Sequence, residues 1–126
     1  MGGFAAVSPN GEILLSSLLN VDLNTGNDQS VGLPSGLKLI SRIVVVDATG
    51  TTATVEGGLY TGAAMTGTTV VAAGQVYSAL TATKSLDLTI ANDYLTGTGL
   101  FVALSVLEGA ASTCDIYVFG QILDNL

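Results

Sequence analysis

The chain has 126 residues, of which 48% are hydrophobic and 10% charged, and three Lys or Arg against ten Asp or Glu give a formal net charge of -7. This length predicts one compact domain, and the apolar fraction is far above that of a disordered chain. Three basic residues are too few to neutralise a phosphate backbone, and anionic lipid attracts basic surfaces, so we expect neither nucleic acid nor a membrane as a partner.

Residues 1–34 differ in residue pattern from the rest of the chain. Asn10-Gly11 predicts a tight turn, and the run from Ile13 to Leu23 is apolar. Pro34 then marks a junction, so we expect an N-terminal segment or arm over residues 1–34 that can pair with a neighbouring subunit, and a β-sandwich domain over residues 35–126. The alternative is that the residues before Pro34 form the first two strands of the same domain.

The segment after this junction predicts a strand that enters a core. Leu37 and Leu39 alternate with Lys38, which is the pattern of a strand with one buried face and one solvent-exposed face. The run Ile43 to Val46 is apolar at every position and ends at Asp47, as in a strand that is buried on both faces.

Further short strands follow. Residues 55–60 carry Gly57-Gly58 inside a strand pattern, which suggests a bulge or a close backbone approach. Residues 69–73 predict another short strand, whereas residues 74–80 fit a strand, a turn or one helical turn equally well. In residues 86–90, apolar and polar side chains alternate, as in a half-buried strand.

Two strong strand patterns close the chain. Residues 100–107 and 116–122 are apolar runs linked by a short polar stretch, and together they predict a hairpin. About eight short strands with turn signals between them predict an all-β protein, a single-domain antiparallel β-sandwich of jelly-roll type.

The residue types argue against catalysis. The sequence contains no histidine, which removes the Ser/His/Asp and Cys/His arrangements, and one cysteine cannot supply a zinc site. No serine lies in a G-x-S-x-G context. The lone G-x-G at Gly97 and Gly99 lacks a third glycine and precedes a strand, which favours a β-turn over a phosphate loop.

One loop has some features of a calcium site. Residues 22–28 place oxygen-bearing side chains at alternate positions, as a calcium loop does. Such a loop needs glycine at its sixth place and an acid at its twelfth, where this chain has Asn27 and Leu33. A polar loop without metal is therefore the favoured interpretation.

Several acids are candidates for catalytic or interface groups. A glycosidase needs two facing carboxylates, and the candidates for such a pair are Asp87, Asp93, Glu108 and Asp115. Each of them also fits a solvent-facing strand position or a turn, and no Trp is present to stack on a sugar ring. Glu56, beside the two glycines, fits an edge-strand charge that discourages aggregation, or a charge aimed into an interface.

The remaining candidates are a thiol and the tyrosines. Cys114 precedes an apolar run, where a free thiol usually acts as a small buried hydrophobe. Of the four tyrosines we expect only Tyr94 to be exposed, because residues 92–97 are typical of a loop. We therefore assign no catalytic, cofactor-binding or metal-binding residue, and expect no enzyme activity and no cofactor.

Three segments carry a resemblance to a known class of proteins: Ser41 to Thr49, Glu56 to Thr61 and Asp115 to Gly120. They resemble small β-rich proteins encoded among the head genes of tailed bacteriophages, and the likeness extends over residues 37–122. The resemblance implies a decoration or cement protein, commonly trimeric, that binds the major capsid protein and braces the shell. The alternative is a tail- or fibre-associated binding module, such as a receptor- or carbohydrate-binding β-sandwich.

Composition and resemblance together indicate where the protein acts. The start of the sequence lacks the basic region of a signal peptide, and no window of about 18 residues is free of polar interruptions, so we expect neither secretion nor a transmembrane span. Few charges in a small apolar domain predict a homo-oligomer, and the resemblance implies a homotrimer. The resemblance implies a virion protein on the capsid surface, made in the host cytoplasm.

Overall fold

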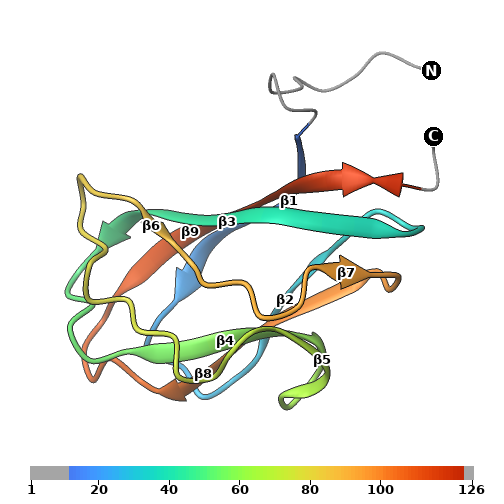
Figure 1. Cartoon of the computed structure of the whole chain (residues 1–126). Helices are drawn as coiled ribbons and strands as arrows, with labels where there is room; N and C mark the ends of the chain where they lie inside the picture. Colours follow the sequence, from blue (N-terminus) through green and yellow to red (C-terminus); the bar gives the residue numbers. More distant parts are fainter. Residues whose placement is uncertain (1–11, 124–126) are drawn as a thin grey trace.

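Two antiparallel sheets are stacked face to face in the computed structural model, which describes residues 12–123 (Figure 1). The described residues form strands and connections without an α-helix. The strands are β1 (Ile13–Asp22), β2 (Gln29–Gly32), β3 (Lys38–Thr49), β4 (Glu56–Gly62), β5 (Thr66–Val71), β6 (Leu86–Asp87), β7 (Tyr94–Leu95), β8 (Gly99–Val106) and β9 (Thr113–Ile122). The expected all-β sandwich is confirmed, whereas its jelly-roll type stays a prediction.

Strand order defines the two layers. Sheet A has five strands in the order β1-β9-β3-β6, with β7 pairing β3 beside β6, and sheet B has four strands in the order β2-β8-β4-β5. The core lies between them, where alternate side chains of both sheets meet. Leu23, Ile43, Leu59, Leu100 and Ile116 are among its most buried members.

The stretch before Pro34 contributes one outer strand to each sheet. Ile13 pairs with Gly120 in sheet A, and Gln29 pairs with Val102 in sheet B. β1 and β2 are therefore integral strands of the sandwich and not a separate arm, because their ladders to β9 and β8 satisfy their backbone groups within the two sheets. The predicted turn at Asn10-Gly11 lies outside the described residues, as does the rest of residues 1–11.

The predicted hairpin of the last two strands is wrong. β8 belongs to sheet B and β9 to sheet A, so the connection between them crosses from one layer to the other. Backbone bonds hold this crossing: the Glu108 amide donates to the Leu23 carbonyl at 3.0 Å, and the Leu23 amide donates to the Ser112 carbonyl at 2.9 Å. Two apolar runs joined by a short link can pair with each other or face each other across a core, and the local pattern does not distinguish the two.

β3 departs from its sequence pattern at both ends. Lys38 is fully buried and Leu39 is partly exposed, which reverses the expected burial of the leucine and exposure of the lysine. The Lys38 ammonium donates to the Gly36 carbonyl at 2.5 Å, which supplies a polar partner for its buried charge. At the other end the strand continues past Asp47, which has a positive φ of 59° at a shift in the register with β9.

The glycine pair in β4 makes the close approach that the sequence predicted. The register with β8 shifts between Glu56 and Gly57, as in a bulge. A methyl group on Gly58 would lie 2.2 Å from the Val71 carbonyl oxygen of β5. Only glycine lets β5 lie this close to β4.

The chain from β5 to β8 runs along one open side of the sandwich, between the edges of the two sheets (Figure 1). In residues 74–80 it forms a bridge from Val76 to Glu56 and a turn closed by the Leu80 amide on the Tyr77 carbonyl, at 2.9 Å. The expected strand over residues 86–90 has the predicted alternation of burial, but only its first two residues join the ladder. Further along, the Ala91 amide donates to the Val70 carbonyl at 2.7 Å, which covers the outer edge of β5.

Candidate functional site

The calcium-like loop uses its oxygen atoms to hold the fold. The Asp22 carboxylate accepts the Asn24 amide at 2.8 Å, and the Asn24 side-chain oxygen accepts the Gly109 amide at 2.8 Å. Asp28 accepts the Ala64 amide at 2.6 Å, which ties the loop to the tip of the β4–β5 hairpin. Oxygens that already accept backbone protons are less available to a cation, so this geometry favours the polar-loop interpretation.

The four acids considered for catalysis lie on different elements and contact different groups. Asp87 on β6 forms an exposed ion pair with Arg42 at 3.3 Å, and Asp115 on β9 accepts the Asn20 amide at 2.8 Å. Asp93 is exposed in the connection between β6 and β7. No group of three or more Cys, Asp or Glu side chains within residues 12–123 is arranged to hold a metal ion.

Glu108 is the acid with the most developed set of contacts. One carboxylate oxygen accepts the Thr54 and Val55 amides at 2.9 and 3.0 Å, and the other accepts the Thr51 hydroxyl at 2.8 Å. The bond from the Thr54 amide lowers the pKa of Glu108 below its ordinary value. Desolvation is the next largest effect and opposes it, and the bonds from Thr51 and Val55 add to the lowering. Glu108 therefore fastens the β3–β4 loop to the β8–β9 crossing as an ionised group.

Glu56 does not lie at a sheet edge. β4 is flanked by β8 and β5, and Glu56 itself pairs with Val106 on one side and with Val76 on the other. The edge-strand explanation of its charge is therefore wrong. Its neighbours Val76 and Val106 are 51% and 39% exposed, so Glu56 lies between two exposed apolar side chains.

The cysteine and the tyrosines occupy the expected environments. Cys114 is buried, and burial together with the negative charge of Asp115 raises the pKa of its thiol to about 12. Tyr77 is also buried, and its hydroxyl donates to the Gly57 carbonyl at 3.4 Å. Tyr94 is 60% exposed, as the sequence predicted.

The G-x-G segment is the connection between β7 and β8, which agrees with the turn interpretation. The Thr98 carbonyl accepts the Leu33 amide at 2.8 Å, so this turn also anchors the end of β2.

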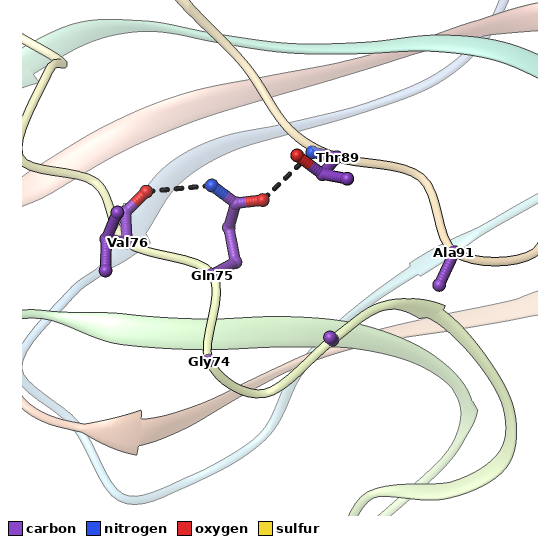
Figure 2. A pocket seen from close by; sticks show the side chains of 6 residues that line it. Gly74, Gln75, Val76, Thr89 and Ala91 are labelled. Carbon is purple, nitrogen blue, oxygen red and sulfur yellow. Dashed lines mark hydrogen bonds between the residues drawn. The ribbon is translucent and has the colours of Figure 1, made fainter.

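One surface hollow of about 310 Å³ lies between two parts of the connection from β5 to β8, around residues 72–76 and 89–91 (Figure 2). Its lining consists of small or apolar side chains and two polar ones, namely Ala72, Gly74, Gln75, Val76, Thr89 and Ala91. Figure 2 shows the Gln75 amide between two backbone groups: it donates to the Val76 carbonyl and accepts the Thr89 amide, each at 2.9 Å. Because the bond from the Thr89 amide joins two parts of the connection that are 14 residues apart, the role of this amide is structural.

The side of sheet A that faces away from the core carries apolar side chains among polar ones such as Arg42 and Asp115. From Thr113 to Gln121 of β9 the half-buried and buried positions alternate, and the half-buried ones include Tyr117 and Phe119. The register places Val44 beside Tyr117 and Leu14 beside Phe119. We call this surface the outer apolar face, and it comprises Leu14, Leu39, Val44, Val46, Tyr94, Tyr117 and Phe119.

The outer apolar face and the exposed apolar residues elsewhere were not recognised from the sequence. The signal was present in β9, where Ile116 to Phe119 is apolar at consecutive positions, a pattern of strands covered on both sides. Other large apolar side chains are exposed near the end of β8, at Val106 and Leu107, and at the hairpin tip, at Met65.

The structure forms no helix in residues 12–123 that is long and apolar enough to cross a membrane. No family model, no curated protein and no solved structure matches this chain.

Proposed function

We propose that this chain is a non-enzymatic structural protein of a virion, which binds the assembled capsid of a tailed bacteriophage and stabilises it as a decoration or cement protein. The resemblance of residues 37–122 to phage head proteins suggests this role. The observation that carries it is an apolar surface on a chain with few charges: seven large hydrophobic side chains are exposed in the described residues, while 10% of all residues are charged.

The use of the polar groups supports binding without chemistry. Asp22, Asp28, Glu108 and Asp115 accept bonds from backbone amides of their own chain. Groups committed in this way hold loops in place and are poorly placed to exchange protons with a substrate. A rigid sandwich with fixed loops is instead suited to a contact that depends on shape, with an apolar centre and a satisfied polar rim.

Weak contacts suffice for this role because a capsid displays many equivalent sites. A protein that binds the assembled shell and not its free subunits shifts the assembly equilibrium toward the shell at every site that it occupies. Each contact can therefore be modest in area while the total stabilisation is large.

The test compares heads that contain this protein with heads that lack it. We expect heads without it to lose DNA at lower temperature, or on dilution of divalent cations, and purified protein added back to restore retention. Electron microscopy of labelled protein should locate it on the shell. Equal DNA retention, together with label at the tail, would reject the decoration role and favour a tail- or fibre-associated binding module.

A further inference from the structure

We propose that three neighbouring side chains at one end of sheet B, Val106, Glu56 and Val76, are the surface through which this chain contacts the capsid. The partner that fits this surface is a basic side chain of the capsid protein with apolar side chains around it. We call the three residues the Glu56 row. This assignment rests on the proposed decoration role and adds to it the contacting surface and the chemistry of the partner.

Backbone pairing places the three side chains of the Glu56 row on one face. Glu56 of β4 is paired with Val106 of β8 on one side and with Val76 on the other. Side chains of residues directly opposite each other in antiparallel strands lie on the same face of the sheet. Val55 and Tyr77, which follow or precede members of the row in sequence, are buried in the core, so the row lies on the face that points away from the core.

The two valines of the row are exposed. Val76 is 51% exposed and Val106 is 39% exposed, and Leu107, which follows Val106, is 38% exposed. Three of the seven large apolar side chains that are exposed in the described residues therefore belong to this end of sheet B. Apolar side chains around a central polar contact exclude water from it, as they do at the centre of protein–protein interfaces.

The Glu56 carboxylate lies between these valines without a partner of its own. Within residues 12–123 it forms no hydrogen bond and no ion pair. Glu56 is half-buried, so apolar neighbours replace part of the water around its charge, and a cation brought against it interacts more strongly than it would in open water. The Glu108 carboxylate, which accepts the amide of the adjacent Val55 at 3.0 Å, adds a second negative charge at this end of the sheet. A basic side chain is therefore the complement of the Glu56 row.

Hydrogen bonds hold the backbone of the Glu56 row in place. The Ser105 hydroxyl donates to the Glu56 carbonyl at 3.3 Å, and the Gly57 amide donates to the Gln75 carbonyl at 3.0 Å. The side-chain amide of Gln75 donates to the Val76 carbonyl at 2.9 Å (Figure 2). A surface whose backbone is already ordered loses little conformational entropy when a partner binds it.

The charges of the chain favour a different protein over a second copy as the partner. The sequence has three basic residues, of which Lys38 is buried. Arg42 already forms an ion pair with Asp87, which leaves Lys84 as the remaining basic side chain. The formal net charge of -7 also makes two copies repel each other. Arginine suits the Glu56 row best, because its stem packs on apolar side chains while its guanidinium binds a carboxylate through two hydrogen bonds.

The test measures binding of the purified whole chain to heads that lack it, by co-sedimentation over a range of protein and salt concentrations. Glu56→Gln keeps the size of the side chain and removes its charge, and we expect it to bind at least about tenfold more weakly, with a smaller dependence on salt. The matched control is Asp93→Asn, which removes one charge from an exposed acid in the connection between β6 and β7. It should bind as the unchanged protein does.

A second pair of variants tests the apolar part of the row. Val76→Ala shortens a side chain that is 51% exposed in the row, and Leu19→Ala shortens one that is 56% exposed on β1. We expect Val76→Ala to weaken binding several-fold and Leu19→Ala to leave it unchanged. All four positions are at the surface and their side chains form no hydrogen bond within residues 12–123, so the variants should fold, which circular dichroism verifies.

The outcomes separate this contact from the decoration role. If the unchanged protein binds heads and Glu56→Gln binds as well as Asp93→Asn, the decoration role stands and the Glu56 row is not the contact. Equal effects of Val76→Ala and Leu19→Ala also overturn the assignment. If the unchanged protein does not bind heads, the decoration role is rejected and the assignment with it.

Discussion

Replacing Gly58 by alanine should loosen sheet B by pushing β5 away from β4. The new methyl carbon would lie 2.2 Å from the Val71 carbonyl oxygen and 2.9 Å from the carbonyl carbon and oxygen of Ala72. Ordinary contacts begin at 3.4 Å, so the shortest of these falls short by about 1 Å. All three atoms belong to the backbone, and no side-chain rotation can relieve the overlap.

The cost follows from three contributions. Overpacking a tight site costs typically about 1–3 kcal/mol, and the upper part of that range applies because the backbone must move. A shift of this size also weakens the neighbouring ladder bond of the Leu59–Val71 pair, which contributes about 1 kcal/mol. Alanine restricts the unfolded chain more than glycine, which offsets about 0.4–1 kcal/mol. The expected loss of unfolding free energy is about 3 kcal/mol, or a fall in Tm of about 10 °C.

Urea and thermal unfolding followed by circular dichroism measure this loss. The control is Gly97→Ala, where the added methyl group meets nothing within 4 Å and φ is not positive. That variant should lie within about 1 kcal/mol of the unchanged protein. If Gly58→Ala were as stable as Gly97→Ala, the close approach of β4 and β5 would not be what holds this side of sheet B.

Three further outcomes follow from the described contacts. Glu108→Gln should destabilise the fold at neutral pH, because the ionised carboxylate of Glu108 stabilises the folded protein. The folded pKa of Glu108 lies below its ordinary 4.5, so this contribution to the free energy of unfolding is complete above about pH 4.5 and is lost as the pH falls through the folded pKa. Urea unfolding should therefore show the variant and the unchanged protein converging in acid, whereas a constant difference would contradict the role of its charge. The Cys114 thiol, buried and with its pKa raised to about 12, should react with iodoacetamide at pH 8 far more slowly in the folded protein than in denaturant, and equal rates would contradict its burial. Ile116→Ala should cost about 2–5 kcal/mol because its fully buried side chain lies in the core, and Thr66→Ala, at an exposed position of β5, is the control.

The class of the fold and the properties of several positions can be predicted from the amino-acid sequence alone. Runs of β-branched residues between turn residues indicate strands because those side chains fit a pleated, half-buried surface, and β3, β8 and β9 lie where such runs predicted them. The need for glycine at position 58, the burial of Cys114 and the exposure of Tyr94 followed from local pattern as well. These properties depend on a residue and its near neighbours in the sequence, so the linear sequence is enough to predict them.

Which strands pair and which polar groups contact each other cannot be predicted locally and follows from the folded chain. β8 and β9 are neighbours in sequence but lie in different sheets, because strand pairing depends on contacts between distant segments. Lys38 is buried because the core positions of the rest of β3 set the register of the whole strand, and one residue cannot change faces alone. Glu108 binds a loop more than 50 residues away in the sequence, and its partners are backbone amides, which every non-proline residue carries. The outer apolar face likewise appears only when Tyr94, Leu39 and Phe119 are brought onto one surface by pairing.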